Sequence, residues 1–542
     1  MKLKILSSSI LLITCLSIVF CTHRNVQASV KLMDGKLILS GFVKETLYYR
    51  TALYDREKPY HDNRMDFLQT SGLFEALYTL RDDEDFGIRF FTGFKYWWQK
   101  AHYFDEQYRR SLSRNEKIKW AHPRSFEDDV LTEAYVDINT GPWRIRVGKQ
   151  IVIWGQLDLE RVADVVNPLD ISRGPPGINT WEEVKKGLWM IRLFYQSELP
   201  GNLLFEVIFN PGDYETFEGP YEGTPMGALA FRSRDPDPGQ KKEIGMYSYI
   251  REKWMRDAPG WNLKDNYEFG FRIRGNTFDI DWTLLYWNAR DDGPVLDPDT
   301  YLEWGLAYLV DPYNRDSWDW TDGTGVTPGY NPKTRVFKFK RYETIGGTAQ
   351  YYSNKLWETV WRLEWFYEIG RPLNRGIQGN NQIIYNDLFG NGKNGLTRKD
   401  ILGLAIQCNK KWNIPWFTKN VVNNLMLESN ITYGWEKVFG HDRELVLASR
   451  NYHWKNSTND VVTVFLMQGL RDMSFVFVFT GNYFLRTGKW QAIPVVSYVF
   501  PGIHWRADIG YVAYGGAKKE WVKSDGSVES SDLLFLRLRY EF

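Results

Sequence analysis

Cysteine is scarce in this sequence. The 542 residues contain three, Cys15, Cys21 and Cys408, and the first two lie in an N-terminal segment that we expect to be removed. A chain left with a single thiol cannot form an internal disulfide. The sequence therefore excludes the small secreted scaffolds that are held together by several disulfides.

A surplus of charge of either sign is also missing. The chain has 68 Lys and Arg residues against 67 Asp and Glu residues, which gives a formal net charge of +1. Proteins that bind nucleic acid present a clustered basic surface. We therefore expect no nucleic acid partner.

Signatures of catalysis are lacking too. The histidines after position 28 are not spaced as metal ligands, and neither Gly-x-Ser-x-Gly nor His-Glu-x-x-His occurs in the sequence. We expect no enzyme, and this also disfavours a barrel enzyme such as a lipase or protease. No metal site and no cofactor are expected.

Long apolar runs are confined to the N-terminus. A basic start is followed by an apolar run over 5–20 and by small residues at 26–28, which is the pattern of a signal peptide. We expect residues 1–28 to be removed by cleavage after Ala28. An uncleaved anchor is the alternative, although the run is short for a spanning helix. An exported chain without a second such run is periplasmic, secreted or an outer-membrane barrel.

Aromatic residues, in contrast, are abundant. They make up 16% of the chain, with 24 Trp, although the mean hydropathy is −0.44. A polar average with so many aromatic residues is unusual for a soluble enzyme. It suits a membrane barrel with a wet lumen, polar loops and aromatic girdles at both membrane interfaces.

Alternation of apolar and polar residues predicts strands. In the final residues, LLFLRLRYEF, positions 534, 536, 538, 540 and 542 are apolar, whereas Arg537, Arg539 and Glu541 point the other way. An amphipathic last strand with Tyr540 and Phe542 resembles the assembly signal of bacterial outer-membrane barrels. An ordinary edge strand is the alternative.

The same alternation recurs at 277–286, 355–369 and 503–513, with Trp and Tyr on one face and charges on the other. Charges on a face inside a soluble core would be costly, but charges that face a water-filled lumen are not. We predict an all-β chain, with residues 29–542 forming one large antiparallel transmembrane β-barrel of about eighteen strands, sixteen being the alternative. The strand centres are expected near 43, 74, 92, 135, 147, 192, 206, 270, 282, 348, 363, 405, 429, 465, 478, 495, 508 and 538.

The connections mostly alternate in length. Short turns, one of them at Gly275–Asn276, are expected in the periplasm, and long loops at the cell surface. The connection at 411–422 is long for the short side, and that at 485–489 is short for the long side.

One segment, 144–174, carries a motif. It contains RVGKQ at 146–150, Trp154-Gly155 and VNPLD at 166–170, and LSGFVKE stands at 39–45. These pieces resemble a porin-like family of proteobacterial outer-membrane proteins of unknown function, over the N-terminal third of the chain. The resemblance implies a single large barrel and traffic in hydrophobic or lipid-like molecules. Leu157 and Asp158 depart from it, since small or hydroxyl residues are expected there.

The motif leads from the fifth strand into the third long loop, 154–187. The candidate constriction or ligand residues of this loop are Trp154, Gln156, Asp158, Glu160, Asp164, Asn167 and Asp170. The polar faces of nearby strands carry Arg144, Arg146, Arg192, Arg272 and Arg274. If the loop folds into the lumen, its acids would oppose this basic wall and make a selective constriction. The alternative is a solvated loop at the cell surface.

The sequence therefore predicts a channel for a small solute in the outer membrane of a Gram-negative bacterium. The alternative is a non-conducting binding or structural barrel whose loops close the lumen. The expected partners are outer-membrane lipid and lipopolysaccharide, the barrel-assembly machinery and the small-molecule solute. Both a monomer and a trimer are compatible with the sequence.

Overall fold

The computed structural model describes residues 29–51, 65–99, 126–158, 160–171, 178–217, 261–293, 295–296, 337–355, 358–375, 396–412, 427–441, 445–446, 457–471, 473–486, 488–516 and 532–542. The expected signal peptide and its cleavage site at Ala28 lie outside these residues.

The described residues form strands almost throughout. The strands are β1 (Val30–Leu32), β2 (Leu37–Arg50), β3 (Met65–Asp82), β4 (Phe86–Gln99), β5 (Leu131–Thr140), β6 (Trp143–Gln150), β7 (Leu188–Gln196), β8 (Leu204–Asn210), β9 (Glu268–Thr277), β10 (Ile280–Arg290), β11 (Val295–Leu296), β12 (Phe337–Lys338), β13 (Arg341–Ser353), β14 (Thr359–Arg375), β15 (Leu396–Trp412), β16 (Leu427–Val438), β17 (Leu445–Val446), β18 (Thr458–Leu470), β19 (Phe475–Phe484), β20 (Trp490–Val499), β21 (Trp505–Gly515) and β22 (Leu533–Glu541). The helices are short: η1 (Phe126–Val130), α5 (Trp181–Val184) and α7 (Leu263–Asn266).

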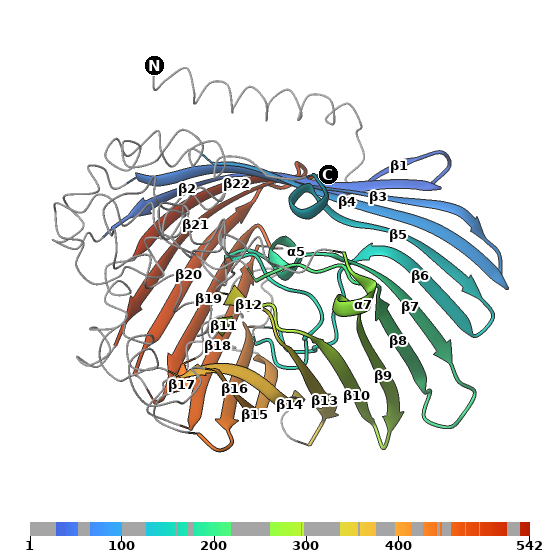
Figure 1. Cartoon of the computed structure of the whole chain (residues 1–542). Coiled ribbons are helices and arrows are strands. Elements are labelled where there is room, and N and C mark those ends of the chain that lie inside the picture. Colours follow the sequence, from blue (N-terminus) through green and yellow to red (C-terminus); the bar gives the residue numbers. More distant parts are fainter. Residues whose placement is uncertain are drawn as a thin grey trace, which may run out of the picture.

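Eighteen of these strands form a closed antiparallel barrel (Figure 1). Each long strand pairs with its neighbour in the chain, and β2 closes the ring against β22, from Phe42 opposite Glu541 to Arg50 opposite Leu533. The prediction of about eighteen strands is confirmed, and every predicted centre lies inside one of them. The short strand β1 extends the ring beside β2, while β17 adds to the end of β14.

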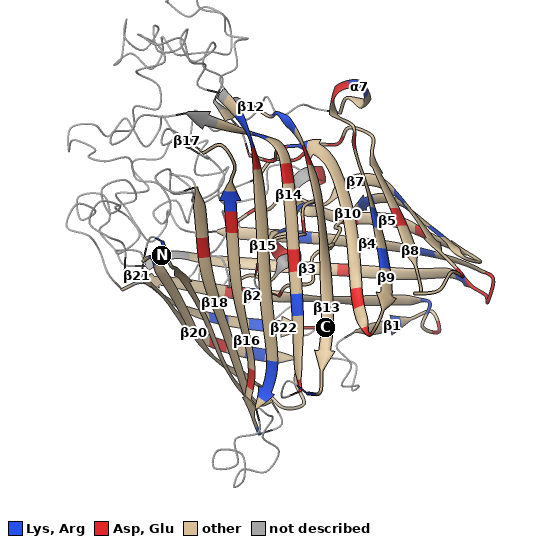
Figure 2. Cartoon of the chain, turned by 90° about the horizontal axis from the view of Figure 1, so that it is seen from below, with Lys and Arg blue, Asp and Glu red and all other residues tan. Residues whose placement is uncertain are grey.

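The two faces of the barrel are reversed relative to a soluble protein. Large apolar side chains such as Val147, Ile191 and Leu536 are exposed, whereas Lys44, Glu364 and Gln407 are buried. In Figure 2 the charged residues of both signs appear as short interruptions in strands that are otherwise uncharged. An apolar outer band with a polar interior is the pattern of a transmembrane barrel.

The turn between β9 and β10 differs from the expectation. The sequence predicts it at Gly275–Asn276, but it lies at Phe278–Asp279, whose φ values are 55° and 61°. Two consecutive residues with positive φ match the right-handed twist of the flanking strands. Asn276 instead pairs across the hairpin, donating from Nδ2 to Asp281 Oδ1 at 2.7 Å.

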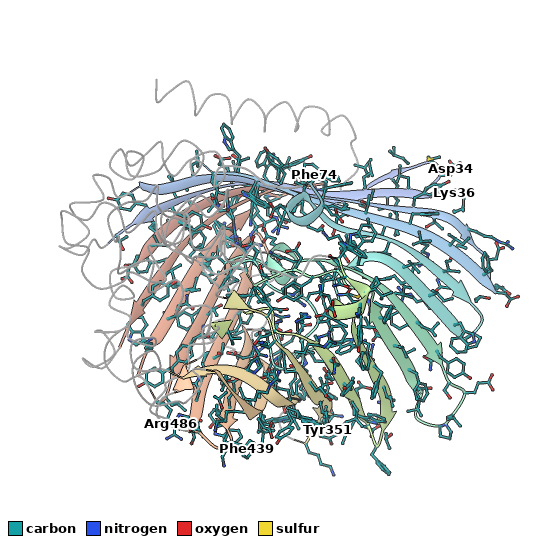
Figure 3. The ribbon with its side chains drawn as sticks, in the orientation of Figure 1. Asp34, Lys36, Phe74, Tyr351, Phe439 and Arg486 are labelled. Atoms are coloured by element: carbon teal, nitrogen blue, oxygen red, sulfur yellow. The ribbon has the colours of Figure 1, made fainter. Side chains whose placement is uncertain are left out.

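The seam between β2 and β22 holds the predicted assembly residues. Phe542 is buried with Tyr540 and Val43, and its ring lies 5.6 Å from that of Phe74, which is labelled in Figure 3. The main chain of Phe542 also exchanges hydrogen bonds of 2.9 and 3.0 Å with Gly41. A Cβ at Gly41 would lie 2.1 Å from the Leu73 carbonyl oxygen and 3.0 Å from the Phe542 ring, so the close approach of both requires glycine here.

Alanine at position 542 should therefore lower the amount of assembled barrel while leaving export through the inner membrane intact. Truncation of a buried Phe costs about 3–5 kcal/mol, and here the loss falls on the strand pair that closes the ring. The measurement is the fraction of protein in the outer membrane whose migration changes on boiling. Glu541→Gln is the matched control, because Glu541 is 42% exposed and forms an ion pair with Arg539. Equal assembly of Phe542→Ala and the native chain would contradict the prediction.

Candidate functional site

The third loop, predicted at 154–187, begins earlier in the structure, because β6 ends at Gln150, and it covers 151–187 up to β7. Residues 159 and 172–177 lie outside the described part. Its base is fastened by Asn167, a fully buried residue. The Asn167 side chain accepts from Val152 N at 2.6 Å and donates to the carbonyls of Gln150 at 3.2 Å and Lys186 at 2.8 Å. The Asn-Pro motif therefore ties the two ends of the loop together.

Trp154 packs the start of the loop against the wall formed by β7, β8 and β10. Its side chain is 1% exposed and belongs to a cluster with Met190, Ile208 and Leu285. The ring meets Trp287 edge-on at 5.8 Å, and the indole N–H donates to Glu206 Oε2 at 3.2 Å. Apolar burial and one directed hydrogen bond thus hold this part of the loop.

Glu364, from the middle of β14, binds the next turn of the loop. Its buried carboxylate accepts the backbone N–H groups of Gln156, of Leu157 at 2.9 Å and of Ala163 at 2.8 Å. A carboxylate that accepts several backbone N–H groups fixes the main chain around it. Gln156 is thus held through its main chain.

The acids Asp158 and Glu160 meet β14 and the strands that follow it. Asp158 Oδ2 accepts from Arg362 Nη1 at 3.0 Å, Gln407 Nε2 at 3.0 Å and Asn430 Nδ2 at 2.9 Å. Glu160 accepts from the hydroxyl of Thr463 on β18. Burial raises the pKa of the Glu160 carboxyl above its ordinary value. Both acids are therefore engaged on the wall formed by β14–β18.

Asp164 and Asp170 make interactions within the loop. The Asp164 carboxylate pairs with Lys185 and accepts from Trp154 N at 3.3 Å. The buried Asp170 donates its N–H to Val184 O at 2.6 Å. These contacts, with those of Asp158 and Glu160, differ from the expected pairing of loop acids with the arginine wall.

The end of the loop reaches the β2–β22 seam. The buried ammonium of Lys44 bonds to Asn179 Oδ1 at 3.1 Å and to the Glu183 carboxylate, while Arg537 Nη1 donates to Ile178 O at 3.1 Å. Burial alone would raise the pKa of Glu183, but the charge and hydrogen bond of Lys44, the backbone N–H of Thr180 and the charge of Arg539 together hold that pKa below its usual range. The loop therefore contacts three sides of the ring, and Figure 1 shows α5 inside it.

The five predicted arginines lie together. They line one cavity of about 490 Å³ with residues of the β5–β6 turn and of the adjoining ends of β7 and β8, at the end of the barrel that carries the short turns. The remaining lining residues are Asn139, Gly141, Pro142, Trp143, Phe194, Gln196 and Leu204. The structure brings the five side chains together, and their role in a constriction stays a prediction.

Two strand carboxylates pair with four of these arginines. Asp137 Oδ2 lies 2.5 Å from Arg144 Nη2 and 2.9 Å from Arg146 Nη2. The Glu206 oxygens lie 2.5 Å from Arg192 Nη2 and 2.7 Å from Arg272 Nη2. Because Glu206 also accepts from Trp154, it joins the arginine wall to the third loop.

The family is settled by comparison of the whole sequence. A model described as "Protein of unknown function (DUF1302)" matches residues 60–542. The chain belongs to this family. The resemblance predicted from the motif at 144–174 is therefore confirmed at the level of a family whose function is unknown. No curated protein matches the sequence at a significant level.

Several solved structures resemble this DUF1302 chain. A BenF-like porin from Pseudomonas fluorescens Pf-5 has a TM-score of 0.44 and 8% identity, covering 95% of this chain and 100% of that one. OccAB3 of Acinetobacter baumannii has a TM-score of 0.42 and 10% identity, covering 93% and 99%. OmpF of Salmonella typhi, in complex with daunomycin, has a TM-score of 0.38 and 11% identity, covering 95% and 100%.

The sequence does not single out three carboxylates of the site. Asp137, Glu206 and Glu364 stand on the polar faces of strands, as do many other charged residues, and no local signal distinguishes them. Among the described residues, no group of three or more His, Cys, Asp or Glu side chains could hold a metal ion. No helix in the described part of the chain is long and apolar enough to cross a membrane.

Proposed function

We propose that the chain is a channel in the outer membrane of a Gram-negative bacterium, through which a small solute passes beside the third loop. The observation that carries this is the polar interior, where an arginine-lined cavity of about 490 Å³ stands open at the end with the short turns. Charged groups are tolerated inside a membrane barrel when water or a polar solute reaches them. Outer-membrane lipid, lipopolysaccharide and the assembly machinery are the proposed partners of the outer surface.

The third loop would narrow the path. It is fastened to β14 by Glu364 and to the seam by Lys44, so it contacts walls on different sides of the ring. A loop held at several points gives a constriction of fixed shape, and the charges around it select among solutes. The resemblance implies a hydrophobic or lipid-like solute. The arginine wall favours a solute that also carries an anionic group.

The alternative is a non-conducting binding or structural barrel. The observation that favours it is the same set of contacts, because a loop fastened on three sides can also close the lumen. Current across a planar bilayer separates the two. A folded barrel that passes no current would overturn the channel and favour the closed barrel.

The ion preference of an open channel should follow the charges of the arginine wall and of the third loop. The double variant Arg144→Gln/Arg146→Gln should shift the reversal potential in a salt gradient towards cations, because it removes two positive charges from the wall. Asp158→Asn/Asp164→Asn should shift it towards anions. Charges in solvent would be screened beyond about 8–10 Å. Identical reversal potentials in both variants, with equal barrel content, would place these residues away from the conducting path.

A further inference from the structure

We propose that the arginine cavity is a binding site for a small organic anion, with a carboxylate at one end and an apolar, ring-sized body. This inference deepens the proposed function, on which it rests in taking the anion as the solute. The charge of the cavity, the register of its strands and its shape all favour such a ligand.

The charge of the cavity favours an anion. The charged side chains that line it are the five arginines, and the two carboxylates that pair with them are Asp137 and Glu206. Five guanidinium groups against two carboxylates leave three positive charges. Guanidinium groups form a rigid fork that binds a carboxylate through two parallel hydrogen bonds. An anionic ligand therefore complements this wall.

The register of the strands sets the groups side by side on one face. Arg144, Phe194, Glu206 and Arg272 are successive partners across β6, β7, β8 and β9. Gln196, Leu204 and Arg274 form the next row towards the short turns. Arg192 and Arg272 are each 7% exposed, and both form ion pairs with the buried carboxylate of Glu206. The accessible guanidinium groups are thus those of Arg144 and Arg274, near the mouth of the cavity.

Arg146 lies deeper in the same wall. Its Nη2 group reaches Asp137, but within the described residues its buried Nε has no hydrogen-bond partner. Its guanidinium lies 4.0 Å from the centre of the Tyr135 ring, which fixes its plane. Arg146 is therefore held in position with donor capacity to spare.

The shape of the cavity suits an organic molecule. A volume of about 490 Å³ falls within the range of small-molecule pockets, about 300–1,000 Å³, and far exceeds what a chloride ion fills. Phe194 and Leu204 add apolar surface between the arginines. The Phe194 ring lies 5.3 Å from the guanidinium carbon of Arg144 and 4.9 Å from that of Arg192. A body with an apolar face matches this lining better than an inorganic anion does.

The inner end of the cavity meets the third loop. Arg272 lies 5.7 Å from the Trp154 ring and donates from Nη1 to Ile153 O at 3.4 Å. A ligand that enters from the short turns therefore meets the loop behind Arg272. The site would hold the anion next to the constriction.

The test is binding of benzoate to the purified full chain in detergent, measured by isothermal titration. Benzyl alcohol has the same ring without the charge, and chloride has the charge without the ring. We expect benzoate to bind more tightly than either. Arg144→Gln/Arg274→Gln should weaken benzoate binding about tenfold to a hundredfold, the loss expected for charge-assisted hydrogen bonds.

Arg506→Gln is the matched control. Arg506 is an arginine of β21 that pairs with Asp508, and Asp508 has a second partner in Arg537, at 2.5 Å, so the variant does not leave a buried carboxylate unpaired. Its benzoate affinity should equal that of the native chain. Heat-dependent migration checks that every variant forms a barrel.

Three outcomes would overturn the site: benzyl alcohol binding as tightly as benzoate, chloride competing equally, or the double variant matching the control. The failure of the channel is a separate result, because binding is measured without a membrane current. A variant-free barrel that conducts but does not bind benzoate would contradict the proposed binding site and support the channel. A barrel that binds benzoate but passes no current would contradict the channel and support the binding site.

Discussion

Glu364→Ala should release the third loop from β14 and raise the single-channel conductance several-fold. The carboxylate accepts the backbone N–H groups of Gln156, Leu157 and Ala163, and it is fully buried. Each buried N–H left without a partner costs about 1–3 kcal/mol. The loop avoids this cost by moving to where water can reach those groups, and the path beside β14 then widens.

Conductance in planar bilayers and hydrogen exchange of the amides of 156–163 measure this release. Both should rise in Glu364→Ala and less in Glu364→Gln, because the amide keeps one acceptor oxygen. Glu343→Gln is the control: Glu343 lies on β13 and accepts a hydrogen bond at 2.9 Å from Tyr286 on β10, away from the amides that Glu364 binds. Native exchange rates and conductance in Glu364→Ala would show that the loop is held without this carboxylate.

Glu206→Gln should destabilise the barrel strongly and lower its melting temperature. Glu206 is 1% exposed and lies between Arg192 and Arg272, with the Trp154 indole as a third donor. Removal of one partner from a buried ion pair costs about 3–5 kcal/mol, because the remaining charges stay buried without compensation. The same change adds one positive charge to the wall, so an open channel should also prefer anions more strongly.

The measurement is the temperature at which the folded form is lost in detergent, together with the reversal potential. Glu541→Gln is again a matched control, since the Glu541–Arg539 pair at 2.9 Å has a carboxylate that is 42% exposed. Exposed pairs contribute about 0–1 kcal/mol, so this control should melt close to the native chain. Equal melting temperatures of Glu206→Gln and Glu541→Gln would show that burial of Glu206 does not govern the strength of its ion pairs.

Strands were predictable because their signal is local. In β22 and in β14 the apolar side alternates with the charged side every second residue, and a lipid-facing strand needs nothing beyond that pattern. The turn at Phe278–Asp279 was missed because local residue types alone do not determine the register of a hairpin. Gly275 and Asn276 are typical turn residues, but the register of β9 with β10 places them in the ladder.

The sequence by itself determined that this chain is a barrel of about eighteen strands, with sixteen as the alternative, and it placed five arginines on the polar faces of nearby strands. These follow from a period of two and from hairpins between neighbouring strands, in which positions close in sequence become partners. Only the tertiary structure decided what the third loop binds. Asp158 meets Asn430, 272 positions away, and Leu157 meets Glu364, 207 positions away. Closure of the ring brings these strands opposite the loop, and alternation within a strand carries no information about what lies across the interior.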